Sequence, residues 1–268
     1  MTYEIDENRM QAFYRTVMSK DKLTPAEQLI MNNNIEQRLA LANNTKTPPE
    51  ILEMLAEDWC VDVRRKVAKN PNTPPEILQK LAGDIYKEVI REVANNPNTP
   101  SEVLHDLITC GDWYVCFYVA KNPNTTPETL SKLSRNKQYT IRSAVASNPK
   151  TPVSILNKLA IDTSKEVRQA VASNPNTPQE TLRKLFKTRD EDILLNLAKN
   201  PNTPPDILQK LANDNDCLVR WGVARNPNTP PETLHKLAND SQWYIRNAVA
   251  ENPNTPQEIR EKILCELK

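Results

Sequence analysis

The sequence predicts an all-α solenoid, a superhelix of about nine two-helix repeats of 26 residues each, with no β-sheet. Three observations lead to this prediction. The pair Asn-Pro recurs at residues 70, 96, 122, 148, 174, 200, 226 and 252, always 26 residues apart, with a degenerate start one period earlier at Asn44. Apolar residues inside each period follow helical spacing. The 22 prolines and three glycines show that proline and asparagine, rather than glycine, end the helices. A strict period of this length is the signature of a repeat protein.

The period divides the chain into three parts. We expect residues 1–43 to form N-terminal capping helices that include a degenerate repeat, because "LTPAEQLI" and "IEQRLALAN" imitate the two helices of later repeats. Residues 44–251 hold eight full repeats, and residues 252–268 hold a half-repeat that caps the C-terminal end. Solenoids need such caps because an end repeat otherwise exposes its apolar face.

Each repeat begins with the segment that starts its first helix, the A helix. With places counted from 0 at the Asn of Asn-Pro, T-P-P-E occupies places 3–6. We expect the Thr to cap the first turn and the Glu to reach back as a capping box. Proline directly after the cap is tolerated because its missing N–H has no helical partner. The A helix should run to about place 12 and bury places 7, 8, 11 and 12.

The second helix of each repeat, the B helix, follows an Asp or Asn at place 14, which we expect to be its cap. Its pattern V-R-x-x-V-A buries places 19, 23 and 24. Asn-Pro then ends it, because the residue before a proline is pushed out of the α region. Helices of about ten residues are too short to be stable alone. Stability must therefore come from stacking repeat on repeat.

An arginine recurs at place 20, opposite the Asp or Asn of place 14. We predict a structural hydrogen-bonded ladder between these side chains, within one repeat or between neighbours. The alternative is an anion-binding row along the groove. The ladder residues are Asp58, Arg64, Asn136, Arg142, Asp162, Arg168, Asp214, Arg220, Asp240 and Arg246.

The two places also lose their polar residues together. Where place 14 is Cys110, place 20 is Cys116, and where place 14 is Thr188, place 20 is Leu194. Asp84 is the exception. Joint loss favours the structural interpretation, because a buried charge without a partner is costly.

Aromatic residues gather on the B helices. The candidate partner-binding residues are Trp113, Tyr114, Phe117, Tyr118, Tyr139, Trp221, Trp243 and Tyr244. We expect one cluster around Trp113 and Phe117, extended by Tyr139, and a second around Trp221 and Trp243. Other repeats place charged or small residues at these places, so the core does not require the rings. Exposed aromatic patches commonly mark binding sites. The alternative is that several of them fill gaps between repeats.

Composition and motifs exclude several classes of function. The formal charge is +1, so no long-range field attracts nucleic acid or an anionic membrane. No run approaches 18 apolar residues, and the start of the chain does not resemble a signal peptide. Five cysteines without a C-x-x-C pair suit a reducing compartment, so we expect a cytoplasmic protein with no metal. No phosphate-binding, metalloprotease or nucleophile-elbow motif occurs, which predicts that the chain is not an enzyme.

The repeat unit "NPNTPPEILQKLA-D-----VR--VA" resembles the leucine-rich-repeat variant family, whose members are α-solenoids, and its second half is similar to HEAT repeats. The resemblance implies scaffolding or partner binding and provides no catalytic residues. Some relatives carry a cysteine-rich iron–sulfur segment ahead of the repeats. Residues 1–43 contain no cysteine, so we expect no cofactor.

The leading functional hypothesis is a non-catalytic scaffold or adaptor that holds a protein or peptide in the groove of the solenoid. One alternative is a nucleic-acid-binding HEAT-like module of the DNA-repair type, because aromatic and arginine side chains can stack on bases. The near-zero net charge disfavours it. A further alternative is a bilin-lyase-like helper, which would bind a pigment.

Overall fold

The computed structural model describes residues 5–18, 28, 31 and 34–266, and every regular element in that part of the chain is a helix. Within these residues, one isolated antiparallel bridge joins Ile5 and Cys60. The predicted all-α class is confirmed. The segment "LTPAEQLI", predicted to imitate an A helix, lies outside the described residues except for Gln28.

The chain divides into two compact units, Met1–Leu133 (unit 1) and Ser134–Lys268 (unit 2), and each is a stack of two-helix repeats. Unit 1 contains α1 (Glu7–Met18), α3 (Ile35–Asn43), α4 (Pro49–Leu55), α5 (Val61–Lys69), α6 (Pro75–Leu81), α7 (Lys87–Asn95), α8 (Ser101–Leu107), α9 (Trp113–Lys121) and α10 (Pro127–Leu133). Unit 2 contains α11 (Tyr139–Ser147), α12 (Val153–Leu159), α13 (Lys165–Ser173), α14 (Gln179–Phe186), α15 (Glu191–Lys199), α16 (Pro205–Leu211), α17 (Cys217–Arg225), α18 (Pro231–Leu237), α19 (Trp243–Glu251) and α20 (Gln257–Glu266).

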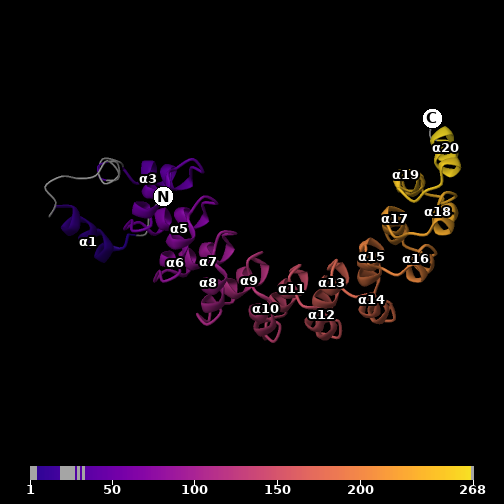
Figure 1. Cartoon of the computed structure of the whole chain (residues 1–268), viewed down its shortest axis with the longest axis horizontal. Coiled ribbons are helices and arrows are strands. Elements are labelled where there is room, and N and C mark those ends of the chain that lie inside the picture. The colour runs from indigo at the N-terminus through magenta and orange to yellow at the C-terminus, as the bar shows by residue number, and fades with distance from the viewer. Residues whose placement is uncertain (1–4, 19–27, 29–30, 32–33, 267–268) are drawn as a thin grey trace. The chain divides into compact units, whose positions relative to one another are not determined.

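Within each unit the B helices pack against one another from repeat to repeat, and the A helices pack against the B helices. In unit 1, α5, α7 and α9 form one row and α6, α8 and α10 form the other (Figure 1). The apolar side chains at places 19 and 23 and the alanine at place 24 are buried in all eight repeats. The alanines allow close approach, so the core of each unit is a seam between successive B helices.

The Asn-Pro-Asn-Thr motif joins neighbouring repeats through its side chains. The buried Asn96 amide donates from Nδ2 to the carbonyl oxygens of Ala68, at 2.7 Å, and Asn70, at 2.9 Å. Asn98 donates from Nδ2 to the carbonyl oxygen of Pro71 at 2.6 Å. The paired bonds of Asn96 recur at Asn70, Asn122, Asn174, Asn200, Asn226 and Asn252. The motif therefore ends each B helix and also links it to earlier repeats.

The capping box predicted for the A helices is wrong. The N-cap of α6 is Pro74, which makes no side-chain cap bond. Because the helix begins at place 5, the Thr at place 3 lies one residue before the cap. The buried Thr73 hydroxyl instead donates to the carbonyl oxygen of Val67 at 2.5 Å, which satisfies an acceptor at the end of the preceding B helix.

Helix α1 lies over the loops that precede α5 and α7. The backbone N–H of Asp6 donates to the carbonyl oxygen of Trp59 at 2.7 Å. From α1, Arg9 places Nη1 3.3 Å from Glu57 Oε2 and Nη2 3.4 Å from Asp84 Oδ2. The N-terminal helix thus contributes a cation to the first repeats of unit 1.

Candidate partner-binding site

At Arg64, Arg142 and Arg220 the arginine of place 20 links one repeat to the next. Arg64 is fully buried, and its Nε and Nη2 bond to the two carboxylate oxygens of Asp84 at 2.7 and 3.2 Å. Its Nη1 donates to the backbone carbonyl of Asp58, in its own repeat, at 2.6 Å. All three nitrogens of Arg64 are therefore used inside the protein, in the two-pronged geometry that guanidinium and carboxylate favour.

The acid at place 14 also has two roles. The Asp58 carboxylate accepts from Arg38 Nε at 2.6 Å and from the backbone N–H of Cys60 at 2.8 Å. The prediction that place 14 caps the B helix is wrong, because Cys60 is the N-cap of α5. Asp58 lies two residues earlier, so its carboxylate closes the turn that leads into the cap.

Unit 2 repeats this arrangement nearer to solvent. Arg142 bonds to Asp162 at 2.7 and 2.8 Å, and Arg220 bonds to Asp240 at 2.7 and 3.2 Å. The hydrogen bonds from Arg142 hold the pKa of Asp162 below its usual value.

The remaining ladder residues take part mainly in bonds between an arginine side chain and a backbone carbonyl oxygen. The carbonyl oxygens of Asn136 and Asp214 each accept from the Nη1 of the arginine in their own repeat at 2.9 Å. Arg168 and Arg246 donate in the same way, at 2.8 Å, to the carbonyl oxygens of Asp162 and Asp240. These own-repeat bonds do not explain the joint loss of polar residues at places 14 and 20, because a backbone carbonyl is present whatever residue stands at place 14.

One rung of unit 1 is shifted along the chain, and sequence reasoning missed it. In the repeat that begins at Asn96, place 14 is Cys110, which has no carboxylate. Arg91, at place 21 of the preceding repeat, bonds instead to Asp112, with Nη2 2.8 Å from Oδ2. This bond lowers the pKa of Asp112 and raises that of Arg91. The signal was the acid two residues after Cys110, matched by an arginine displaced by one place.

Several aromatic rings pack on the ladder. The rings of Trp59, Tyr86 and Tyr114 lie over the guanidinium carbons of Arg38, Arg64 and Arg91, at 4.2, 5.5 and 4.6 Å from ring centroid to Cζ. Such contacts are cation–π interactions, which favour a desolvated arginine. Of the candidate partner-binding residues, Tyr114 therefore fits the alternative interpretation, in which aromatic rings fill space between repeats.

On α9 the four candidate aromatic residues, which we call the α9 cluster, differ in exposure. Trp113 is 44% exposed and stacks on Tyr114, which is 40% exposed, with ring centroids 3.6 Å apart. One turn later Phe117 and Tyr118 are half-buried and pack edge to face at 5.6 Å. Because Arg91 covers Tyr114, Trp113 is the ring of this cluster that is most available to a partner.

In unit 2 the structure separates the predicted second cluster into two parts. Trp243, at the start of α19, is 62% exposed and packs edge to face with Tyr244 at 6.1 Å. A hydrogen bond with Cys217 of α17 raises the pKa of Tyr244. Trp221, one turn further along α17, is half-buried beside two cations. Tyr139, predicted to extend the α9 cluster, belongs to α11 of unit 2, where it is exposed.

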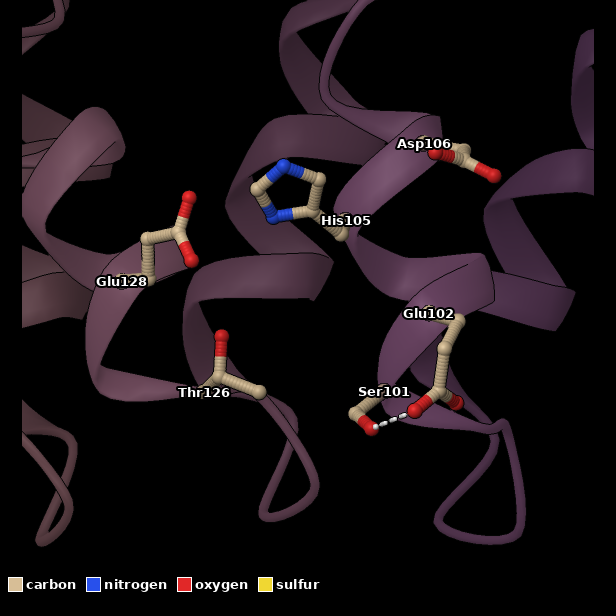
Figure 2. A pocket seen from close by; sticks show the side chains of 6 residues that line it. All are labelled: Ser101, Glu102, His105, Asp106, Thr126 and Glu128. Atoms are coloured by element: carbon tan, nitrogen blue, oxygen red, sulfur yellow. Dashed lines mark hydrogen bonds between the residues drawn. The ribbon is translucent and has the colours of Figure 1, made fainter.

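A hollow of about 260 Å³ lies between α8 and α10. Figure 2 shows the His105 ring reaching from α8 toward Glu128, while Asp106 lies on the other side of the ring from it. His105 Nδ1 lies 2.7 Å from the Thr129 hydroxyl, and Nε2 lies 2.7 Å from Lys132 Nζ.

The corresponding side chain in unit 2, Asn157, makes the same link to Thr181 of the next repeat. His105 therefore occupies a place that joins neighbouring A helices, and both of its ring nitrogens are already bonded. Among the described residues, no group of three or more His, Cys, Asp or Glu side chains could hold a metal ion. In the same part of the chain no helix has both the length and the apolar character needed to span a membrane.

Short A and B helices stacked in register and joined by recurring side-chain bonds define an α-solenoid repeat protein. The family model described as "Leucine rich repeat variant" matches residues 61–84, 166–186 and 218–242. The resemblance to this family is thus confirmed over these three segments.

One solved structure supports the fold. It is described as "a leucine-rich repeat variant with a novel repetitive protein structural motif" and is 22% identical, with a TM-score of 0.53, over 83% of this chain and 94% of that one. At this identity it shows the fold alone.

Two other matches have TM-scores too low to define a shared fold. An engineered protein is 18% identical with a TM-score of 0.40, over 90% of this chain and 92% of that one. A designed armadillo repeat protein in complex with the peptide (KR)4 is 15% identical with a TM-score of 0.25, over 90% of this chain and 99% of that one. No curated protein matches the chain.

Proposed function

We propose that the chain is a non-catalytic scaffold or adaptor that binds a protein or peptide partner on its B helices, with exposed aromatic side chains as anchors. The observation that carries the proposal is the exposure of Trp113 and Trp243 at place 17. Other repeats fill this place with Lys87, Lys165 or Glu191, so the repeat does not need a ring there. A tryptophan that projects into water buries a large apolar area when a partner covers it.

The variation between repeats also supports a binding surface on the B helices. The A helices keep nearly one pattern, P-E-I-L-x-K-L, whereas places 17, 18, 21 and 25 of the B helices change from repeat to repeat. We call the side chains at these four places the B-helix surface. A stacked fold tolerates change where side chains do not hold the stack together, and such places are free to be adapted to a partner.

The nucleic-acid alternative has less support. The B-helix surface carries exposed carboxylates, among them Glu88, Glu166 and Glu191, and the formal charge of the chain is +1. A surface for DNA should be markedly basic. Tight complexes in a gel shift at low salt, weakening steeply as salt is added, would reverse this order. Visible absorbance on mixing with a linear tetrapyrrole would favour the bilin-lyase-like alternative.

We further propose a cytoplasmic location, because the free cysteines suit a reducing compartment. The scaffold proposal is tested by partner capture. The tagged chain is incubated with an extract of its source cells, and recovered proteins are quantified by mass spectrometry. Trp113→Ala, Trp243→Ala and the double variant should progressively lose the partner that the unchanged chain recovers, by about tenfold or more for the double variant.

The matched control is Ile161→Ala, which removes an even more exposed apolar side chain outside the B helices, in the loop after α12. It should recover the partner fully. All variants should keep the thermal unfolding curve of the unchanged chain, since exposed side chains add little to stability. A partner that is retained by the double variant would refute the scaffold proposal as stated.

A further inference from the structure

A hollow on the B-helix surface of unit 2 indicates which kind of partner the scaffold accepts. It has a volume of about 330 Å³ and is lined by Lys199, Trp221, Gly222, Arg225 and Asn226. The first comes from the end of α15 and the next three from α17. The Asn226 side chain already bonds to two backbone carbonyls, so the indole and the two cations determine the chemistry of the hollow.

Two cations flank one indole ring. Lys199 Nζ lies 5.7 Å and Arg225 Cζ lies 5.1 Å from the centroid of Trp221. Both cations are exposed, and neither is hydrogen-bonded or ion-paired to another residue of the described chain. By contrast, Lys165, on the same surface, is paired with Asp192 at 3.0 Å.

The glycine explains why the two cations share one ring. A Cβ on Gly222 would lie 2.9 Å from the Cβ of Ala198, closer than real contacts allow. Glycine therefore permits α17 to lie against the end of α15. This close approach brings Lys199, from one repeat, beside the Trp221 of the next.

The same place in the following repeat, place 25 of α19, is Glu251. Its carboxylate accepts from Asn247 Nδ2 at 3.0 Å, and among the described residues it forms no ion pair with Lys199 or Arg225. A smaller version of the arrangement exists in unit 1, where Lys121 Nζ lies 5.5 Å from the Phe117 centroid, again at places 25 and 21. The pairing of a ring with a cation one turn later thus occurs in both units.

We propose that this hollow receives an acidic side chain of a partner peptide, with the carboxylate between Lys199 and Arg225 and an adjoining apolar side chain against Trp221. The inference rests on the proposed scaffold function and names the partner class for it. Two unpartnered cations match one or two carboxylates, and the indole face provides the apolar contact. A nucleic acid presents a continuous row of phosphates, and a chain with a formal charge of +1 does not provide the broad basic surface that such a row requires.

The test uses the full-length chain, labelled with ¹⁵N, and the indole N–H signals of its four tryptophans. The signal of Trp221 is assigned as the one missing from Trp221→Phe. The probe is the peptide acetyl-Glu-Glu-Leu-Glu-Glu-Leu-amide, and the comparison probes are its lysine counterpart and a ten-nucleotide oligo(dT). We expect a saturable shift of the Trp221 signal with the acidic peptide and none with the lysine peptide.

Substitutions then separate charge from packing. The double variant Lys199→Gln with Arg225→Gln should weaken binding of the acidic peptide by about tenfold or more, because a charge contact is lost from each side. Arg225→Lys should keep most of the affinity. The control is Lys210→Gln, because Lys210 also lies over a ring, Phe186 at 5.8 Å, but on the A helices. It should bind like the unchanged chain.

The inference is overturned by a silent Trp221 signal, by equal affinity in the double variant, or by tighter binding of the lysine peptide or the oligonucleotide. The capture experiment distinguishes this failure from failure of the scaffold proposal. A partner that still depends on Trp113 and Trp243 while Trp221 stays silent leaves the scaffold in place and removes only the acidic-peptide inference.

Discussion

The same ion pair occurs in both units of the molecule, but its surroundings differ. In unit 1 the side chains of Arg64 and Asp84 are both 0% exposed, whereas in unit 2 those of Arg220 and Asp240 are 15% and 8% exposed. The geometry is nearly identical, with Nε to Oδ2 at 2.7 Å in each. The difference lies in the cover, because Arg9 of α1 reaches Asp84 and the Tyr86 ring lies over Arg64.

The same ion pair therefore need not contribute equally to the free energy of unfolding in every repeat. Burying a charge is costly, so a buried pair contributes little net stability when intact but leaves a large deficit when one partner is removed. A pair near solvent leaves a smaller deficit, because water replaces the lost partner. Repeats with the same bonds should therefore respond unequally to the same substitution.

The largest effect is expected for Arg64→Ala. It leaves the Asp84 carboxylate buried, with the partly exposed Arg9 and the Tyr86 backbone N–H as its described partners, and should destabilise unit 1 by about 3–5 kcal/mol. Hydrogen–deuterium exchange read by mass spectrometry should show faster exchange in α5 and α7. Exchange in these helices that matches the unchanged chain would contradict the claim that burial sets the cost.

Arg220→Ala is the matched substitution in unit 2 and should cost less, about 1–2 kcal/mol, because Asp240 can be hydrated. The measurement is the same exchange experiment on α17 and α19. A loss as large as that of Arg64→Ala would show that cover by α1 and Tyr86 does not matter.

Acid should weaken unit 2 through Asp162. Hydrogen bonds from Arg142 hold its folded-state pKa below the unfolded value of about 3.9, so its stabilising contribution is complete above that value and is lost as pH falls through the lower, folded pKa. We expect the urea midpoint of unit 2 to fall progressively below about pH 4. In Arg142→Gln the acid-dependent part of this fall should shrink. If the urea midpoint of that variant falls with pH as steeply as in the unchanged chain, Asp162 is not the cause of the acid sensitivity.

The smallest effect is expected for Arg9→Gln, at about 1 kcal/mol or less, because Arg9 is partly exposed. This substitution is most informative when it is combined with Arg64→Ala. If α1 provides part of the cover, the costs of Arg9→Gln and Arg64→Ala should not add, because both act on Asp84. Strict additivity in exchange or urea unfolding would separate α1 from the ladder.

Much of the fold was predictable because a strict period multiplies every local signal. The Asn-Pro stops, the buried places 8, 11, 19, 23 and 24, and the two helices per repeat all follow from patterns repeated eight times. The turn chemistry was not predictable in the same way. Thr73 lies outside the A helix because two prolines displace the helix start, a detail that the T-P-P-E pattern does not distinguish from a cap.

The period itself hides the partner of each residue. In a chain that repeats every 26 residues, an acid six places before an arginine is also an acid 20 places after it, in the next repeat. Asp58 and Asp84 were equally good partners for Arg64 on spacing alone, and only the structure shows a carboxylate bond to one and a carbonyl bond to the other. Exposure of Trp113 and of Trp221 was likewise undetermined, since it depends on neighbouring repeats.

The asparagine amides have a direction. Each donates to carbonyls made earlier in the chain, as Asn96 does to Ala68 and Asn70, and as Asn226 does to Ala198 and Asn200. During synthesis on a ribosome, a newly emerged turn would therefore find its acceptors already in place behind it. This set of bonds can therefore form repeat by repeat from the N-terminal end, because no bond in it waits for an acceptor that has not yet been synthesised.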